Sequence, residues 1–301
     1  VLVGTILMTI QPFFVKLSQN ADGQIEYSSS SAVLCMELLK ILISVSCFLA
    51  DSKRPQVSFE WREFLQYSVP ALIYFLNNNL TFVILSQTDA ATFQLVGQLK
   101  TVFTALLFRI VLSRKLEVYQ YLAICQLACG SAVSQIPSNS PDDRRSSFLG
   151  FLLTAFASLL SALGGIYNEK LLKGKDRNAI HWQNSLLYVW GIGFNLLGEA
   201  LRGSSLSVAG FFKGYNFWTL MVVVSNAFCG LAISAILKYA DNIARVYASA
   251  SAMLLTMLLS VGFLGEPLTT QLLLALIIVT MSVVQYNMKP EQLGLSEEKE
   301  K

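Results

Sequence analysis

Long apolar runs separated by short polar segments make up most of the chain. Ten runs approach or exceed the length of about 20 residues that an α-helix needs to cross a bilayer core about 30 Å thick. They cover approximately residues 1–18, 28–50, 68–86, 88–112, 117–136, 148–170, 179–201, 216–238, 241–264 and 268–287. The pattern predicts an all-α integral membrane protein with ten transmembrane helices.

The polar segments between these runs are short, so no separate soluble domain is expected. Residues 51–66 mix charges with Phe59, Trp61 and Phe64, which suits a short interfacial helix. Residues 137–147 form a charged loop, and we expect residues 288–301 to be a disordered cytoplasmic tail. The loops after the second, fourth and sixth runs carry most of the basic residues, which places both termini in the cytoplasm.

The second half of the chain repeats features of the first half. A shift of 152 residues places Asp89 on Asp241, and each aspartate is an N-cap candidate for the run that follows it. Several leucines also coincide. Because each half contains five runs, the second copy must enter the membrane in the opposite orientation. We therefore expect two inverted five-helix repeats, residues 1–136 and 148–287, around a central cavity.

The composition excludes several functions. Hydrophobic residues make up 54% of the chain and charged residues 14%, against roughly 25% charged in an average soluble domain. The net charge of +3 is too small to suggest a nucleic-acid binder. A single histidine, His181, leaves little for a metal site or a histidine-based triad. We expect no cofactor and no catalytic group, and we expect the five cysteines to be buried thiols.

Lys100 lies about halfway along the fourth run, where a charge is costly. The i, i+3, i+4, i+7 spacing groups four residues on one helical face: Gly97, Lys100, Thr101 and Thr104. A glycine beside a lysine and two hydroxyls suits a cavity wall, and an ammonium group is a compact cation that suits a phosphate. The alternative is a structural lysine paired with a carboxylate such as Glu37.

Three polar residues share one face of the third run: Tyr74, Asn77 and Asn78. Asparagine offers a donor and an acceptor that can read the edge of a base, and tyrosine offers a stacking face. Membrane bundles also use such residues as interhelical hydrogen-bonding groups, so packing is the alternative.

Polar residues in the later runs have both functional and structural explanations. The sixth run carries a stripe that is either a packing face or a binding wall: Ser161, Gly164, Gly165 and Asn168. In the seventh run, Asn184 and Tyr188 could meet the same ligand. Lys238 ends the eighth run, where it could extend to the membrane interface. Glu37 and Lys40 can pair with each other at i, i+3, which favours a structural role.

Five stretches of the chain carry a family signature: CMELLKILIS (35–44), YFLNNNLTF (74–82), DAATFQLVGQLK (89–100), GGIYNEKLLK (164–173) and KYADNIARVYASASA (238–252). Together they resemble the nucleotide-sugar transporters of the drug/metabolite transporter superfamily, in the branch of the CMP-sialic acid and UDP-galactose transporters. The similarity extends to plant members of the CMP-sialic acid type. It implies a Golgi antiporter that exchanges cytosolic CMP-sialic acid, or a related CMP-sugar, for lumenal CMP.

The resemblance also implies substrate-binding residues. Lys100 matches a position at the nucleotide phosphate, and Lys238 matches a second lysine of the cavity. Six others match the nucleoside-binding wall or lie close to it: Tyr74, Asn78, Asn184, Tyr188, Ser161 and Gly165. Asn77 and Trp190 stand where animal relatives usually have glutamine and serine, and both could alter the sugar end of the pocket. We include Asn77 in the expected site.

Three other functions stay open. The same fold could exchange UDP-galactose for UMP, since these ligands also carry about two negative charges each. A membrane-embedded transferase would need a metal site, for which Asp142 and Asp143 are the only adjacent acids outside the tail. A proton-driven exporter would need Glu37 to titrate. The expected partners are a nucleotide sugar, a nucleoside monophosphate and the lipid bilayer, with no nucleic acid and with a homodimer as one option.

Overall fold

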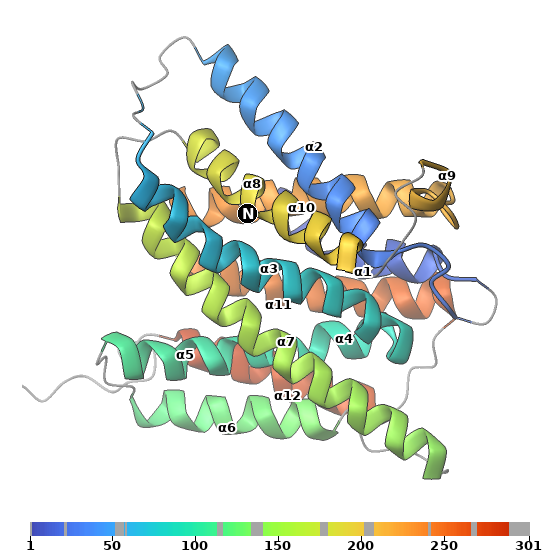
Figure 1. Ribbon diagram of the computed structural model, residues 1–301. Helices are drawn as coiled ribbons and strands as arrows, with labels where there is room; N and C mark the ends of the chain where they lie inside the picture. The colour runs from blue at the N-terminus through green and yellow to red at the C-terminus, as the bar shows by residue number, and fades with distance from the viewer. Residues whose placement is uncertain are drawn as a thin grey trace, which may run out of the picture.

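The computed structural model is a bundle of α-helices packed side by side (Figure 1). It describes residues 2–20, 23–51, 57, 59–112, 117–133, 141–174, 180–201, 208–239, 242–265 and 270–288. All regular secondary structure within these ranges is helical. The predicted tail, apart from Met288, lies outside them, as does the N-cap candidate Asp241.

Each of the ten predicted runs falls on one helix or on a broken pair. The first half contains α1 (Leu2–Leu17), α2 (Ser29–Ala50), α3 (Trp61–Gln87), α4 (Ala90–Val96), α5 (Leu99–Leu112) and α6 (Val118–Val133). The second half contains α7 (Pro141–Gly174), α8 (Ile180–Leu201), α9 (Val208–Phe211), α10 (Phe217–Tyr239), α11 (Asn242–Leu259), the π-helical segment η1 (Ser260–Leu264) and α12 (Thr270–Asn287). The prediction of an all-helical membrane protein is confirmed.

Two boundaries differ from the prediction. No separate interfacial helix occupies the described part of residues 51–66, because α3 begins at Trp61 and continues through the membrane run. Pro70 lies inside α3 and cannot donate a backbone bond to the Gln66 carbonyl, yet the helix continues through it to Gln87. At the other boundary, α7 begins at Pro141, inside the predicted loop. Proline suits this position, since the first helical residue needs no N–H partner.

The predicted fourth span is broken at Gly97 and Gln98. The N–H groups of Lys100 and Thr101 donate to carbonyls three residues earlier, at 3.1 and 2.8 Å, rather than four residues earlier. This tighter winding rotates the side chains that follow. The predicted face is therefore not continuous: Gly97 and Lys100 line the cavity described below, whereas Thr101 and Thr104 do not.

Helices of the first half pack against helices of the second half. The pairs include α2 with α8, α3 with α7, α6 with α12 and α1 with α10. In Figure 1, α2 and α8 lie at one edge of the bundle, and α6 and α12 lie at the opposite edge. One apolar core joins α1, α2, α3 and α10, and another joins α4, α5, α6, α11 and α12. A third apolar cluster joins α3 and α8.

The outer surface is apolar. Leu42 is 64% exposed, Leu258 64% and Phe263 75%, which suits contact with lipid rather than water. Among the described residues, four helical stretches are long and apolar enough to cross a membrane by length and composition: Ser29–Ala50, Trp61–Gln87, Phe148–Gly174 and Phe217–Tyr239. Three shorter apolar stretches accompany them, Leu2–Leu17, Ala248–Phe263 and Leu273–Tyr286.

The cysteines are free thiols, but their expected burial is only partly correct. Cys229 is buried and Cys35 is half-buried, whereas Cys47, Cys125 and Cys129 are exposed on the outer surface. A thiol is a small apolar group, so it suits a lipid-facing position as well as a protein core. Sequence patterning alone does not separate these two apolar environments.

Candidate functional site

A cavity of about 240 Å³ lies between the two halves of the chain. Its lining comes from α1, α2, α3, α4, α5, α7, α8, α10 and α11 and from the break between α4 and α5. Within the described ranges, α6, α9 and α12 contribute no lining residue. The cavity therefore lies inside the bundle, where both halves meet.

Six of the nine predicted substrate-binding residues line this cavity: Tyr74, Asn77, Asn78, Lys100, Ser161 and Tyr188. The other three, Gly165, Asn184 and Lys238, do not. Gly165 and Asn184 are buried in the packing, and Lys238 Nζ donates to Gln183 Oε1 at 2.6 Å. Two of these three lie where α8 begins and α10 ends, so the cavity stops short of that end of the bundle.

Tyr74 is held against α7 by close packing. Its hydroxyl donates to the Gly164 carbonyl at 3.2 Å, and a Cβ at Gly164 would lie 3.0 Å from the Tyr74 ring. Ser161 and Asn168, on the same stripe, line the cavity instead. Packing therefore explains Gly164, whereas Ser161 and Asn168 line the cavity, where a binding role stays a prediction.

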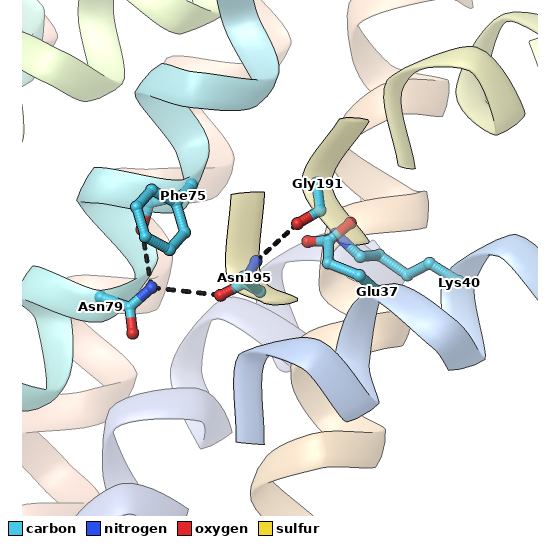
Figure 2. Close-up of polar contacts among 6 residues, drawn as sticks. All are labelled: Glu37, Lys40, Phe75, Asn79, Gly191 and Asn195. Carbon is cyan, nitrogen blue, oxygen red and sulfur yellow. Dashed lines mark hydrogen bonds and ion pairs between the residues drawn. The ribbon is translucent and has the colours of Figure 1, made fainter. Parts of the chain in front are cut away.

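The three consecutive asparagines of α3 separate into two roles. Asn77 and Asn78 line the cavity, whereas Asn79 lies in the helix interface. As Figure 2 shows, Asn79 Nδ2 donates to the Phe75 carbonyl at 2.9 Å and to Asn195 Oδ1 at 3.3 Å. Interhelical hydrogen bonding thus explains the third asparagine and leaves the first two for a ligand.

An ion pair from α2 forms part of the cavity wall. Lys40 Nζ lies 2.5 Å from Glu37 Oε1, and both side chains are about nine-tenths buried. The ammonium group is 4.5 Å from the centroid of the Tyr188 ring, in cation–π range. Glu37 therefore forms its ion pair with Lys40, one turn along the same helix.

Two glycines make room for this ion pair. A Cβ at Gly191 of α8 would lie 2.9 Å from Glu37 Oε2, and a Cβ at Gly230 of α10 would lie 3.1 Å from Lys40 Cδ. Figure 2 shows the Glu37 carboxylate beside Gly191. The absence of side chains at these two positions lets α8 and α10 approach α2 closely.

Lys100 lies in the first turn of α5, directly after the helix break. The N-terminal end of a helix carries positive partial charge, and broken helices in transporters direct such ends toward anionic groups. Gln98 fastens the break to α11 through bonds of 3.3 Å from its Nε2 to the Ser249 carbonyl and hydroxyl. Among the described residues, the charged side chains that line the cavity are Lys40, Lys100 and Glu37, two cations and one anion.

Trp190 lies outside the cavity. Its Nε1 donates to the Phe64 carbonyl at 2.8 Å, and its ring lies between the rings of Phe64 and Phe194, with centroids 4.9 and 5.8 Å away. Of the two positions expected to alter the sugar end of the pocket, Asn77 lines the cavity and Trp190 belongs to the α3–α8 interface.

Several lining residues were not among the predicted site residues. Asn195 lies seven residues after Tyr188 on α8, so helical spacing from that tyrosine could have indicated it. Ser249 of α11 also lines the cavity, at the position that the 152-residue shift places on Gly97. Among the described residues, no group of three or more metal-ligating side chains is present, and the side chains of Asp142 and Asp143 lie outside the described set.

Comparison with known proteins identifies related sequences. A family profile described as "Nucleotide-sugar transporter" matches residues 1–287. CMP-sialic acid transporter 1 of Oryza sativa subsp. japonica is 38% identical, with 94% of this chain and 92% of the relative covered. CMP-sialic acid transporter 1 of Arabidopsis thaliana is 35% identical over 96% and 89%. The UDP-N-acetylglucosamine transporter of Homo sapiens is 36% identical over 89% and 87%.

A solved structure described only as "Crystal structure of protein" shares the fold. The TM-score is 0.63, with 97% of this chain and 96% of that chain covered. The sequences are 14% identical, so this likeness concerns the arrangement of helices alone.

Proposed function

The chain belongs to the nucleotide-sugar transporter family, and on this premise we propose that it exchanges a cytosolic CMP-sugar, such as CMP-sialic acid, for lumenal CMP. The protein is a transporter and not an enzyme, and it crosses the membrane several times. The exchange takes place in the Golgi membrane with both termini in the cytoplasm. The observation that carries the proposal is a cavity between the two halves of the chain, lined by Lys100 and by hydrogen-bonding side chains, in a chain of this family.

The lining residues have distinct proposed roles. Lys100 binds the nucleotide phosphate, since an ammonium group at a helix N-terminus favours an anion. Tyr74 and Tyr188 offer ring faces to the nucleoside, and Asn77, Asn78 and Ser161 offer hydrogen bonds. For Gly165, Asn184 and Lys238, contact with the ligand requires a conformation in which the cavity extends toward the start of α8.

Alternating access between two inverted repeats supplies the mechanism. We assign residues 1–136 and 148–287 to the two repeats, and the helix packing supports this assignment. Exchanging the halves relates α1 to α7, α2 to α8, α3 to α10, α4 and α5 to α11, and α6 to α12. Under this exchange, α3–α7 becomes α10–α1, α3–α8 becomes α10–α2, and α5–α7 becomes α11–α1. All six of these helix pairs pack against each other. The packed pairs α2–α8 and α6–α12 are unchanged by the exchange, because each joins a helix to its own counterpart.

Charge couples ligand binding to transport. The Lys100 ammonium group lies in a low-dielectric interior where charge is costly, and a bound phosphate places an anion beside it. Loaded carriers should therefore change conformation more readily than empty ones, which makes the exchange obligatory. An exporter driven by protons is less well supported, because the Glu37 carboxylate is bonded to Lys40.

Counterflow in liposomes tests this function. Purified protein is reconstituted into vesicles with or without internal CMP, and the uptake of labelled CMP is followed. We expect uptake only where internal CMP is present. Equally fast uptake into empty vesicles would contradict obligatory exchange.

A UDP-sugar is the second candidate substrate. The human UDP-N-acetylglucosamine transporter is about as similar to this chain as the plant CMP-sialic acid transporters are. UDP-galactose and UMP also carry about two negative charges each, as CMP-sialic acid and CMP do. Thermal stabilisation of the purified protein by CMP and by UMP separates the candidates. Greater stabilisation by UMP would favour a UDP-sugar.

A further inference from the structure

Asn168 of α7 has an unusual environment for a buried polar side chain. It is 2% exposed and lines the cavity, yet its Oδ1 has no hydrogen-bond partner among the described residues. Buried amide oxygens in native proteins are nearly always bonded, because burial without a partner costs the lost hydration. Asn184 Oδ1 also lacks a partner among the described residues, but unlike Asn184, Asn168 lines the cavity, where a ligand can supply one.

A second asparagine in the same cavity shows what a structural role looks like. Asn195 is 1% exposed and also lines the cavity. Its Nδ2 donates to the Gly191 carbonyl at 2.8 Å, and its Oδ1 accepts from Asn79 (Figure 2). Asn195 thus stabilises the helix contact, whereas Asn168 contributes no such bond.

The register of α3 against α7 locates Asn168 along the cavity. Gly150 lies against Thr88 and Gly164 lies against Tyr74, so the helices run antiparallel and Asn168 lies one turn beyond the Tyr74 contact. Asn77, whose Oδ1 also lacks a partner among the described residues, lies on the other side of Tyr74. In this register Asn77 lies opposite residue 161 of α7. Asn168 is seven residues farther along α7, a distance of about 10 Å along the helix axis. An extended ligand beside the Tyr74 ring would reach both.

We propose that Asn168 is a specificity-determining residue that hydrogen-bonds an uncharged polar group of the bound nucleotide, either the edge of the base or a sugar hydroxyl. This inference rests on the proposed function. An amide offers one acceptor and two donors, so it can pair with either group. The ligand supplies the partner that the described residues do not offer to Asn168 Oδ1.

The test replaces Asn168 with the similarly sized apolar leucine. Binding of CMP, UMP and a nucleotide sugar is measured with the purified full chain, wild type and Asn168→Leu. We expect affinity to fall about three- to tenfold, the range for one net hydrogen bond. An equal loss for CMP and CMP-sugar assigns Asn168 to the nucleoside, and a loss confined to the nucleotide sugar assigns it to the sugar. Either pattern supports the proposal.

Stability without ligand distinguishes this role from a structural one. Asn168→Leu removes an unpaired buried amide, so Tm should stay the same or rise, whereas Asn195→Leu breaks two hydrogen bonds and should lower Tm. Asn226→Leu is the control in the nucleotide-binding measurements. Asn226 bonds to the Val222 carbonyl within α10 and does not line the cavity. Asn168→Ser replaces the leucine variant if leucine does not fit.

Two results overturn the inference in different ways. If wild type binds the nucleotides and the Asn168 variants bind them within twofold of wild type, the role of Asn168 is wrong and the proposed function stands. If wild type binds none of the three probes, the proposed function fails and the role of Asn168 fails with it.

Discussion

Charged residues in the membrane interior fall into two kinds in this protein. Glu37 and Lys40 are buried together on one helix and form an ion pair. Lys100 follows a helix break and lines the same cavity from α5. Sequence position alone identifies all three as costly, but only their neighbours separate a structural pair from a ligand-binding candidate.

Replacing Lys100 tests its proposed role. Lys100→Ala should weaken CMP binding at least tenfold, because it removes a charged hydrogen-bond donor from an anion site. Isothermal titration with purified protein measures this change. Lys173→Ala is the control, since Lys173 pairs with Glu169 away from the cavity. Affinity retained in Lys100→Ala would remove this lysine from the site.

Breaking the α2 ion pair should destabilise the protein. Glu37→Gln leaves the Lys40 ammonium buried without its carboxylate, which in comparable buried pairs costs about 3–5 kcal/mol. Glu169→Gln, in a more exposed pair with Lys173, should cost less than about 1 kcal/mol. Denaturation in detergent compares them, and equal losses in both variants would show that the buried pair has no special role.

At the scale of helices, local signals and packing each determine part of the structure. Asp89 caps α4 as predicted, since its carboxylate accepts from the Thr92 N–H at 2.6 Å. The break between α4 and α5 was not predicted, because the apolar run continues across it. The approach of α2 to α8 depends on Gly191, which is recognisable only when Glu37 of another helix is seen beside it.

This close approach gives a matched pair of glycine substitutions. Gly191→Ala places a Cβ 2.9 Å from Glu37 Oε2, so α8 or the carboxylate must shift, and we expect a loss of about 1–3 kcal/mol. A Cβ at Gly193, also in α8, meets nothing within 4 Å. Gly193→Ala should therefore be neutral or stabilising, because alanine favours a helix. Thermal denaturation compares the two, and an equal effect would exclude the packing explanation.

At the scale of the whole molecule, the cavity is smaller than its proposed cargo requires. Its volume of about 240 Å³ is below the range of roughly 300–1,000 Å³ that is usual for drug-sized ligands. Binding a nucleotide sugar should therefore move the helices apart. Hydrogen bonds between helices, such as Ser28 to Glu199 at 2.7 Å, hold one end of the α2–α8 pair together in this conformation.

The charge of the cargo predicts how exchange responds to voltage. CMP-sialic acid and CMP each carry about two negative charges near neutral pH, so one-for-one exchange moves almost no net charge. A membrane potential imposed on liposomes with a potassium gradient and valinomycin should change the exchange rate little. A strong dependence on the potential would show that the exchange is not one-for-one in charge.

The sequence by itself determined the helical membrane architecture and the residue types of the site. Apolar runs specify spans locally, because each helix satisfies its own backbone hydrogen bonds in lipid. Helical spacing also grouped Tyr74, Asn77 and Asn78 correctly. Only the tertiary structure showed that Asn79 bonds to Asn195 of α8 and that Trp190 lies outside the cavity. These outcomes depend on contacts between helices far apart in the chain, and a periodic pattern within one helix carries no information about its partner.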